Sequence, residues 1–307
     1  MSLKDIKLKI KSIDRTRKVT KAMEAVSAVK MRKSQGRALS ARPYASAALS
    51  ILERLSVSLS TLKHPLTSER ALSKAALVVV TSDKGLCGVL NAAVEKEATA
   101  VLKSLGLPKE SVSIFAFGKK GAEYFERRGY AIAERVENVS DEVVIADLSK
   151  ISENITAAFS RKEFDQVHVV YTNFKSTFEQ KPISHQVLPL SLDTVTQMVT
   201  GIIPEKGKFS EPQGDRPKGP SYYTVEPSLE EVVLTLIPHL VSTLFFHALL
   251  ESKASEHSAR RVAMKNASDK SLERSRLLTR VFNKARQAGI TREVSEIVGG
   301  IEAMATS

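Results

Sequence analysis

The feature that most constrains this chain is the scarcity of glycine and proline in its last eighty residues. After Pro227 the only proline is Pro238, and no glycine occurs before Gly289. Apolar residues recur at helical spacing through most of this stretch. A helix from Ser228 to about Gly299 would be roughly 110 Å long at about 1.5 Å per residue, whereas helices of globular proteins average about a dozen residues. Such a helix has to pack against something equally long.

A second long helix is predicted at the N-terminus. Ser2 and Asp5 have the spacing of a capping box, and neither Gly nor Pro follows before Gly36. We predict one apolar seam along this helix, made of Leu3, Ile6, Ile10, Ile13, Val19, Met23, Val26 and Met31. The helix is expected to span residues 1–62, with Pro43 tolerated as a kink.

Between the two helical segments the period of the sequence changes. The apolar run Ala75–Ser82 is typical of a buried strand, and the glycines of Asp83–Gly88 lead it into a helix. Further strands are predicted at 111–117, 130–136, 166–172 and 183–190, and helices at 91–105, 119–128 and 143–159. This alternation indicates an α/β domain over residues 75–190, with a mostly parallel, doubly wound sheet.

The segment that follows is predicted to be a linker. Residues 201–227 hold five of the eleven prolines and four of the fourteen glycines. We therefore assign residues 191–227 to a linker and foot, and residues 228–307 to the C-terminal helix. Val232–Leu250 carries no charged side chain, which raises the alternative of a membrane span. Because it contains a proline and two histidines, a helix buried against the α/β domain is the better interpretation.

The net charge of +12 is concentrated in the terminal helices. Residues 1–42 carry a net charge of +10, residues 43–250 of −2, and residues 251–307 of +4. Basic helices imply an acidic partner, which could be nucleic acid, anionic lipid or an acidic protein surface. A basic coiled-coil protein that binds nucleic acid or acts as a scaffold is therefore one interpretation. Against it, no aromatic stacking residues share faces with the cations, and the neutral middle offers no basic groove.

The sequence holds no recognisable catalytic, cofactor-binding or metal-binding pattern. No phosphate-binding Gly-x-x-x-x-Gly-Lys-Ser/Thr occurs, and Gly85 and Gly88 lack the third glycine of a dinucleotide fingerprint. The six histidines are scattered, without the spacing of metal ligands. Cys87, the single cysteine, excludes an internal disulfide and fits a reducing compartment. We therefore expect no cofactor, no metal and no catalysis by the chain itself.

Four parts of the sequence carry a resemblance to one family. They are Ile10–Ile13 with Val19–Glu24; Thr81–Gly88; Tyr223–Ser228; and the C-terminal runs Ala254–Arg260, Val262–Ala267 and Phe282–Thr291. In these segments, and in their order from end to end, the chain resembles the gamma subunit of F-type ATP synthases. Val89 and Arg261 depart from the residues usual at those places in the family.

The resemblance implies a central rotor shaft that is not itself catalytic. The terminal helices would form a long antiparallel two-helix coiled coil inside a hexamer of alternating alpha and beta subunits. The α/β domain would stand on the membrane c-ring beside the epsilon subunit. Rotation would couple ion flow through the ring to ATP synthesis or hydrolysis in the beta subunits, without any nucleic-acid partner. We expect peripheral association with the cytoplasmic face of a bacterial plasma membrane, or alternatively with the matrix side of the mitochondrial inner membrane.

The resemblance also implies roles for particular residues. Contacts with beta subunits are expected at Met23, Lys84, Cys87, Arg260, Arg286, Gln287 and Thr291. The foot on the rotor ring is expected at Tyr223, Val225 and Glu226. A bearing seam, with apolar residues alternately four and three positions apart, is expected at Ile290, Val294, Ile297, Ile301 and Met304. Lys84 and Cys87 are expected to be partly exposed at the sheet's carboxyl edge, with a buried thiol as the open alternative.

Overall fold

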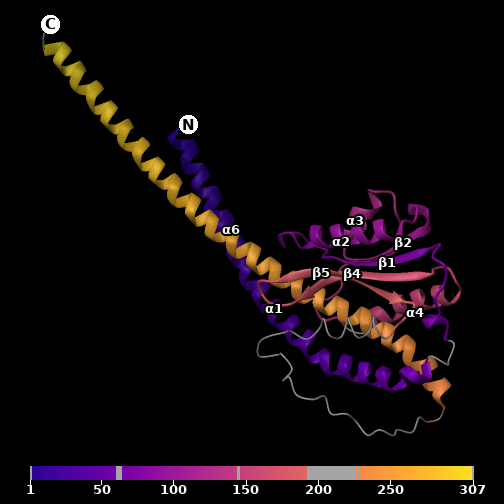
Figure 1. Cartoon of the computed structure of the whole chain (residues 1–307). Coiled ribbons are helices and arrows are strands. Elements are labelled where there is room, and N and C mark those ends of the chain that lie inside the picture. The colour runs from indigo at the N-terminus through magenta and orange to yellow at the C-terminus, as the bar shows by residue number, and fades with distance from the viewer. Residues whose placement is uncertain (1, 60–63, 144–145, 192–225, 227, 306–307) are drawn as a thin grey trace. The chain divides into compact units, whose positions relative to one another are not determined.

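A computed structural model describes residues 2–59, 64–143, 146–191, 226 and 228–305 (Figure 1). The chain divides into two compact units. The two-helix unit consists of Met1–Ser27 and Arg261–Ser307, and the sheet unit is Ala28–Arg260. Helices α1 (Leu3–Leu59) and α6 (Leu229–Ala305) each contribute residues to both units. The predicted fold class, an α/β domain with two long terminal helices, is confirmed.

The described residues of the sheet unit form a five-stranded sheet in the order β3-β2-β1-β4-β5. Its strands are β1 (Ala75–Val80), β2 (Val112–Phe117), β3 (Ala131–Val136), β4 (Gln166–Phe174) and β5 (Gln180–Leu188). The first four strands pair in parallel, and β5 pairs antiparallel with β4. Strand order runs outward from β1 in one direction and from β4 in the other, so the sheet is doubly wound as predicted.

The helices described within the sheet unit lie close to their predicted positions. They are α2 (Leu90–Leu105), α3 (Lys119–Glu126) and α4 (Ala146–Ser160), with the short 3-10 helices η1 (Pro65–Thr67) and η2 (Lys109–Ser111). The differences from prediction are one to three residues at helix ends, where a hydrophobic period carries least information. The predicted end of α1 at residue 62 lies outside the described residues, which show helix as far as Leu59.

Two hydrophobic cores cover the two faces of the sheet. On one face, side chains of β1 and β2 such as Leu77 and Ile114 pack against α2 and α3 through Val94 and Phe125. On the other face, alternate residues of the same strands pack against α4 and the first part of α6. Figure 1 shows α2 and α3 on the side of the sheet opposite to α4.

The uncharged segment of α6 lies in the second of these cores. Ile237, Val241 and Ala248 are buried there together with the α4 residues Ile155 and Phe159. Among the described residues, Leu234–Ile301 is long and apolar enough by composition to cross a membrane, but 56% of its most apolar window is buried inside the protein. The prediction of a helix buried against the sheet domain is confirmed for this segment.

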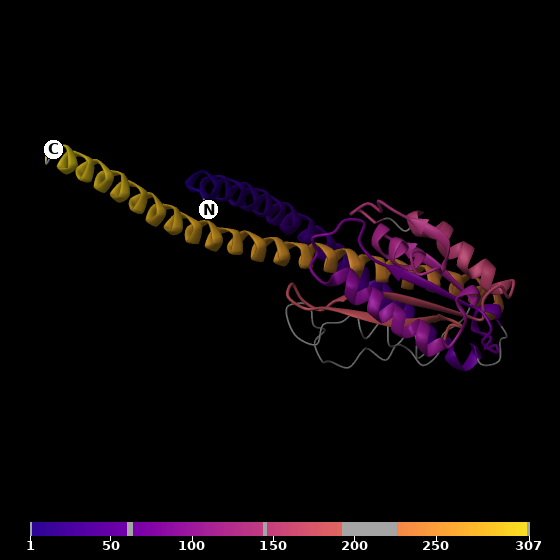
Figure 2. The same ribbon diagram turned by 90° about the horizontal axis from the view of Figure 1, so that it is seen from above.

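The two-helix unit pairs α1 with α6 in antiparallel orientation (Figures 1 and 2). The Ser275 hydroxyl donates to Asp14 Oδ1 across the pair (2.9 Å). Buried or half-buried positions of α1 recur four and three residues apart, at Ile6, Ile10, Ile13, Arg17, Thr20, Glu24 and Ser27. On α6 they recur in the same way, at Met264, Ser268, Ser271, Ser275, Leu278, Phe282, Ala285 and Gly289. Both helices therefore present the seven-residue repeat of a coiled coil.

The predicted seam of α1 was wrong at three positions, since Leu3, Val19 and Val26 are all exposed. Val19 and Val26 are 58% and 57% exposed, and the buried positions beside them are Thr20 and Ser27. The repeat that begins at Ile6 continues through these small polar residues because they let two helices approach closely. Counting apolar residues alone shifts the seam by one position, which is about 100° around a helix.

Gly118 and Gly129 give a test of the packing between β1 and α3. Both have positive φ, 93° and 79°, but a Cβ on Gly118 would lie 2.2 Å from the carbonyl oxygen of Thr81, whereas one on Gly129 would meet nothing within 4 Å. Gly129→Ala should cost about 1 kcal/mol of unfolding free energy, for backbone strain alone. Gly118→Ala should cost at least about 2–3 kcal/mol, because β1 or α3 must also move. Chemical denaturation of both variants checks this, and equal losses would contradict it.

Candidate functional site

The segment Glu251–Arg260 of α6 is polar and buried at the same time. Its buried polar residues are Glu251, Ser252, Lys253, Ser255, Glu256, His257, Ser258 and Arg260. Charged side chains are rarely buried without partners, because transferring a charge out of water is unfavourable. The partners of this segment therefore show what α6 holds in place within the sheet unit.

Three residues of the segment bind the carboxyl end of β4. The Phe174 N–H donates to Glu251 Oε2 (2.8 Å), and the Thr172 N–H donates to Ser252 Oγ (3.1 Å). The Ser255 hydroxyl donates to the Thr172 carbonyl (3.2 Å). β4 lies beside β1 at the point where the strand order reverses, which is where doubly wound sheets bind ligands. In this chain, side chains of α6 form hydrogen bonds with the backbone groups of β4 at that point.

Four further residues of the segment form what we call the α6 polar network. They are Lys253, Glu256, His257 and Arg260. Lys253 donates to the carbonyl of Val139 (3.0 Å) and lies 3.8 Å from Glu256. Glu256 pairs with Arg260, one helical turn further on, at 2.7 Å. The network thus links neighbouring turns of α6 to one another and to loops of the sheet unit.

Asp141, in the loop between β3 and α4, connects this network to α1. Its carboxylate lies 2.7 Å from His257 Nε2 and 2.6 Å from Lys30 Nζ, and Arg37 donates to its backbone carbonyl (2.8 Å). Burial acts to raise the pKa of Asp141, but the hydrogen bond from Lys30 and the charge and hydrogen bond of His257 lower that pKa to about 2. Burial lowers the pKa of His257, against the raising effect of Glu256 and Asp141. The Asp141 carboxylate is therefore ionised at neutral pH.

Arg260 connects the network to the turn Asp83–Gly88, between β1 and α2. Its guanidinium donates from Nη2 to the Lys84 carbonyl (3.2 Å) and from Nε to the Gly85 carbonyl (3.4 Å). At the start of the turn, Asp83 accepts hydrogen bonds from two backbone N–H groups, each at 3.0 Å. The turn is therefore fastened to α6 on one side and to neighbouring loops on the other.

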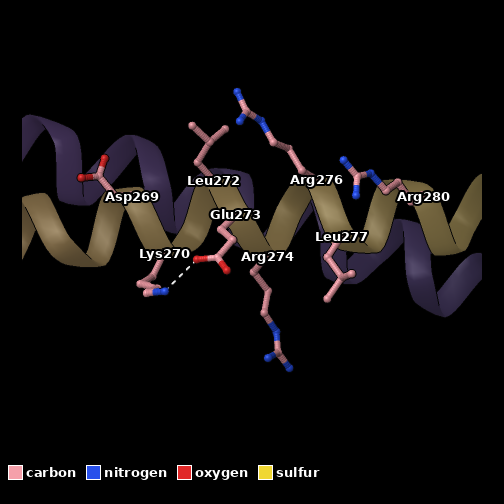
Figure 3. Close-up of a pocket in the computed structure, with 8 residues that line it drawn as sticks. All are labelled: Asp269, Lys270, Leu272, Glu273, Arg274, Arg276, Leu277 and Arg280. Atoms are coloured by element: carbon pink, nitrogen blue, oxygen red, sulfur yellow. Dashed lines mark hydrogen bonds and ion pairs between the residues drawn. The ribbon is translucent and has the colours of Figure 1, made fainter.

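A shallow hollow of about 740 Å³ lies along α6 in the two-helix unit (Figure 3). It is lined by Asp269, Lys270, Leu272, Glu273, Arg274, Arg276, Leu277 and Arg280. Figure 3 shows Arg276 and Arg280 on one side of the helix and Lys270 and Arg274 on the other. Lys270 pairs with Glu273 at 2.8 Å. The hollow is a charged helix surface rather than an enclosed cavity for a small ligand.

Comparison with known proteins identifies the family. A family model described as ATP synthase matches residues 2–304. The chain is 38% identical over 303 residues to the ATP synthase gamma chain of Pelotomaculum thermopropionicum, and the match covers 99% of each chain. It is 40% identical over 301 residues to the ATP synthase gamma chain of Cupriavidus necator, covering 98% of this chain and 99% of the relative. The chain belongs to the ATP synthase gamma-chain family.

Solved structures agree with this gamma-chain fold. A chain of the Euglena gracilis mitochondrial ATP synthase matches with a TM-score of 0.63 and 16% identity, over 98% of this chain and 94% of that one. A chain from the central stalk and c-ring of the Tetrahymena thermophila mitochondrial ATP synthase matches with a TM-score of 0.58 and 23% identity, over 81% and 99%. At these identities the likeness concerns the fold alone.

Three residues predicted from the gamma-chain resemblance come together at the turn. Lys84 is exposed, Cys87 lies beneath the turn, and Arg260 holds it from α6. The expectation of a partly exposed thiol was wrong, because Cys87 is only 2% exposed. The amide of Asn91 donates to its sulfur (3.4 Å), and the Ser82 hydroxyl lies 3.7 Å from it. The exposed apolar side chains here are instead Leu86 and Val89.

The other predicted residues lie outside this cluster. In the two-helix unit Met23 is half-buried, whereas Arg286, Gln287 and Thr291 are exposed. The predicted bearing seam is 53–83% exposed, at Ile290, Val294, Ile297, Ile301 and Met304. Of the predicted foot, Tyr223 and Val225 lie outside the described residues, and Glu226 is exposed.

Sequence reasoning missed Asp141, Glu256 and His257. The spacing of Glu256 and Arg260, four residues apart on a predicted helix, was a signal for an ion pair. Asp141 gave no such signal, since its partners Lys30 and His257 are more than a hundred residues away on each side.

The depressed pKa of Asp141 predicts a pH-dependent contribution to stability. A folded-state pKa of about 2, below the ordinary 3.8, means that the contribution is complete above pH 4 and is lost as the pH falls toward 2. Asp141→Asn should therefore lower the unfolding free energy at pH 7 by about 1–2 kcal/mol, after allowance for partial solvent screening. The loss should shrink between pH 4 and pH 2.

Glu142→Gln is the matched control for this prediction. Glu142 is the next residue, is more exposed, and pairs with Arg37 at 2.9 Å. As a surface ion pair it should contribute less than about 0.5 kcal/mol. Denaturant unfolding at each pH measures both variants. A deficit of Asp141→Asn that stays constant as the pH falls would indicate a packing effect rather than ionisation.

Proposed function

We propose that this chain is the central rotor shaft of an ATP synthase. Membership of the gamma-chain family is the observation that carries the proposal. The shaft would turn inside a hexamer of alpha and beta subunits and stand on the membrane c-ring, beside the epsilon subunit. Its rotation would couple ion flow to ATP synthesis or hydrolysis, with catalysis in the beta subunits. The complex would hold it peripherally at the cytoplasmic face of a bacterial plasma membrane.

The shape of the chain's longest element supports this function. α6 has 77 residues, and the part after Gly289 exposes the predicted bearing seam, an apolar stripe of Ile290, Val294, Ile297, Ile301 and Met304, to solvent. A soluble protein rarely leaves such a stripe uncovered unless another protein packs on it. A ring of subunits around the helix end would cover the stripe from all directions and let it turn.

The proposed contacts follow the exposed predicted residues. Beta-subunit contacts are proposed at Lys84 of the turn and, in the two-helix unit, at Met23, Arg286, Gln287 and Thr291. Arg260 and Cys87 would act from behind the turn, since both are buried within the sheet unit. The foot on the rotor ring is proposed at Tyr223, Val225 and Glu226.

Co-purification tests the proposal directly. An affinity-tagged chain expressed in its own host should recover alpha, beta and epsilon subunits in a complex that hydrolyses ATP. A probe fixed to the sheet unit should rotate when ATP is added. Recovery of the chain with nucleic acid, in a salt-resistant complex without alpha or beta subunits, would favour the basic-scaffold interpretation instead.

Single alanines on the exposed polar group test the beta contacts. Arg286→Ala, Gln287→Ala and Thr291→Ala should each slow ATP-driven proton pumping roughly fivefold, since an interface contact of about 1 kcal/mol changes a rate by that factor. The isolated chain should keep its thermal midpoint, because these side chains are exposed. Arg292→Ala, an exposed arginine paired with Glu296 at 3.6 Å, is the control. Normal pumping by all three variants would refute these contacts.

Charged substitutions in the apolar stripe test the bearing. The double variant Ile297→Asp with Ile301→Asp should fold normally, since the two side chains are 63% and 62% exposed. Assembly with alpha and beta subunits should fall strongly, because a buried carboxylate in an apolar contact is unfavourable. Val281→Asp places one carboxylate on an exposed apolar residue outside the stripe and should assemble better. The yield of complex on size-exclusion chromatography decides between these outcomes.

A further inference from the structure

We propose that Arg260 is a positioning residue: its buried guanidinium fixes the turn Asp83–Gly88 to α6. The exposed side chains of the turn, Lys84 and Leu86, would then follow α6 as one rigid body. The consequence for coupling rests on the proposed rotor function, but the fixing of the turn does not. Arg260 would thus act on its own chain, without touching a beta subunit.

The contacts of Arg260 fit the fork of a guanidinium. One edge of the group reaches two successive backbone carbonyls, those of Lys84 and Gly85, at 3.2 and 3.4 Å. Nη2 also donates to Glu256 Oε1 (2.7 Å), and Nη1 lies 3.5 Å from His257 Nδ1. Arg260 is 8% exposed, so water competes little for these bonds. A lysine ammonium is a point charge and cannot reproduce this planar pattern.

Among the described residues, few other contacts hold the middle of the turn. Leu86 and Gly88 both have positive φ, 65° and 64°. A leucine in the left-handed region of φ and ψ is strained, and it keeps this conformation only where its surroundings impose it. Leu86 and Val89 are exposed and gain nothing from burial within the chain. The Lys84 carbonyl also accepts from the Ser82 hydroxyl (2.7 Å), which is local to the turn. Arg260 is the contact that links these backbone groups to α6.

The carboxylate of Glu256 offsets the unfavourable burial of the Arg260 charge. This carboxylate lies between Arg260 at 2.7 Å and Lys253 at 3.8 Å, and all three side chains are about nine-tenths buried. The pair is oriented along the helix with the acid first, which is the favourable order for residues four apart. The ion pair therefore restrains the position of the guanidinium relative to α6, so that it points toward the turn.

Cys87 provides a reporter for the position of the turn. It is the only cysteine, and its sulfur is buried beneath the turn between Ser82 and Asn91. If the turn loosens, the thiol should become accessible while strands β1 and β4 remain protected. The reaction of Cys87 with an aromatic disulfide reagent, and amide hydrogen exchange of the turn, then measure local opening without global unfolding.

Two variants of Arg260 in the full-length chain test the proposal. Arg260→Lys keeps the charge for Glu256 but removes the fork, and it should raise the thiol reaction rate and the amide exchange of the turn at least about tenfold. Arg260→Gln should raise both further. Arg70→Gln is the matched control, because Arg70 also donates to backbone carbonyls of the sheet unit, at Phe159 and Phe164. The control should leave the thiol rate unchanged.

A thiol rate in folded Arg260→Lys equal to that of the wild-type chain would overturn the proposal, whether or not Arg260→Gln folds. In the assembled complex, Arg260→Lys should lower the number of protons pumped per ATP hydrolysed. A purely structural role would reduce the yield of complex and leave that ratio unchanged. A loosened turn with an unchanged ratio would refute the coupling consequence, and failure of the wild-type chain to assemble at all would refute the rotor function instead.

Discussion

The burial of α6 against the sheet is the interaction on which the rest of the sheet unit depends. Ile237, Val241 and Ala248 lie in the core that α4 and one face of the sheet also form. A fully buried Ile or Val side chain contributes about 1.5–3 kcal/mol, so this part of the helix cannot leave the sheet without a large loss of stability. Once it is fixed, the next two turns of α6 lie at the carboxyl end of β4, where strand backbone groups need partners. That position explains why an apolar segment gives way abruptly to Glu251, Ser252 and Ser255.

The polar network that follows favours a unique arrangement more than it adds stability. Burying charges is unfavourable, and replacing a buried ion pair by apolar residues is often neutral or stabilising. The network instead fixes geometry, because Lys253, His257 and Arg260 each reach a different point on two loops. Through Asp141 it also reaches Lys30 of α1. For a chain that has to transmit torque, attachments by directional bonds resist sliding better than apolar contacts, which have no preferred direction.

The sequence predicted the features that depend on local periodicity, and it missed those that depend on distant partners. The parallel strands and both long helices could be predicted from short stretches of sequence, because each type of element has its own hydrophobic period. The resemblance pointed to Lys84, Cys87 and Arg260 as separate contacts of one partner, and the structure shows that they meet at one turn. The burial of Cys87 could not be predicted, since it is set by Ser82, Asn91 and the conformation of the turn. The seam of α1 was misplaced at Val19 and Val26 because its register is set by α6.

The register of the apolar residues also distinguishes two faces of α6, the one that packs on α1 and the one that carries the exposed apolar stripe. The buried repeat that faces α1 ends at Gly289, and its continuation would fall at Arg292, Glu296 and Gly299, none of which is a coiled-coil core residue. The apolar stripe that begins at Ile290 is one or two positions out of phase with that repeat, roughly 100–200° around the helix. It is therefore not a continuation of the pairing with α1. One helix carries two successive packing surfaces on different faces. The first is covered within the chain, and the second, being exposed, is available to other subunits.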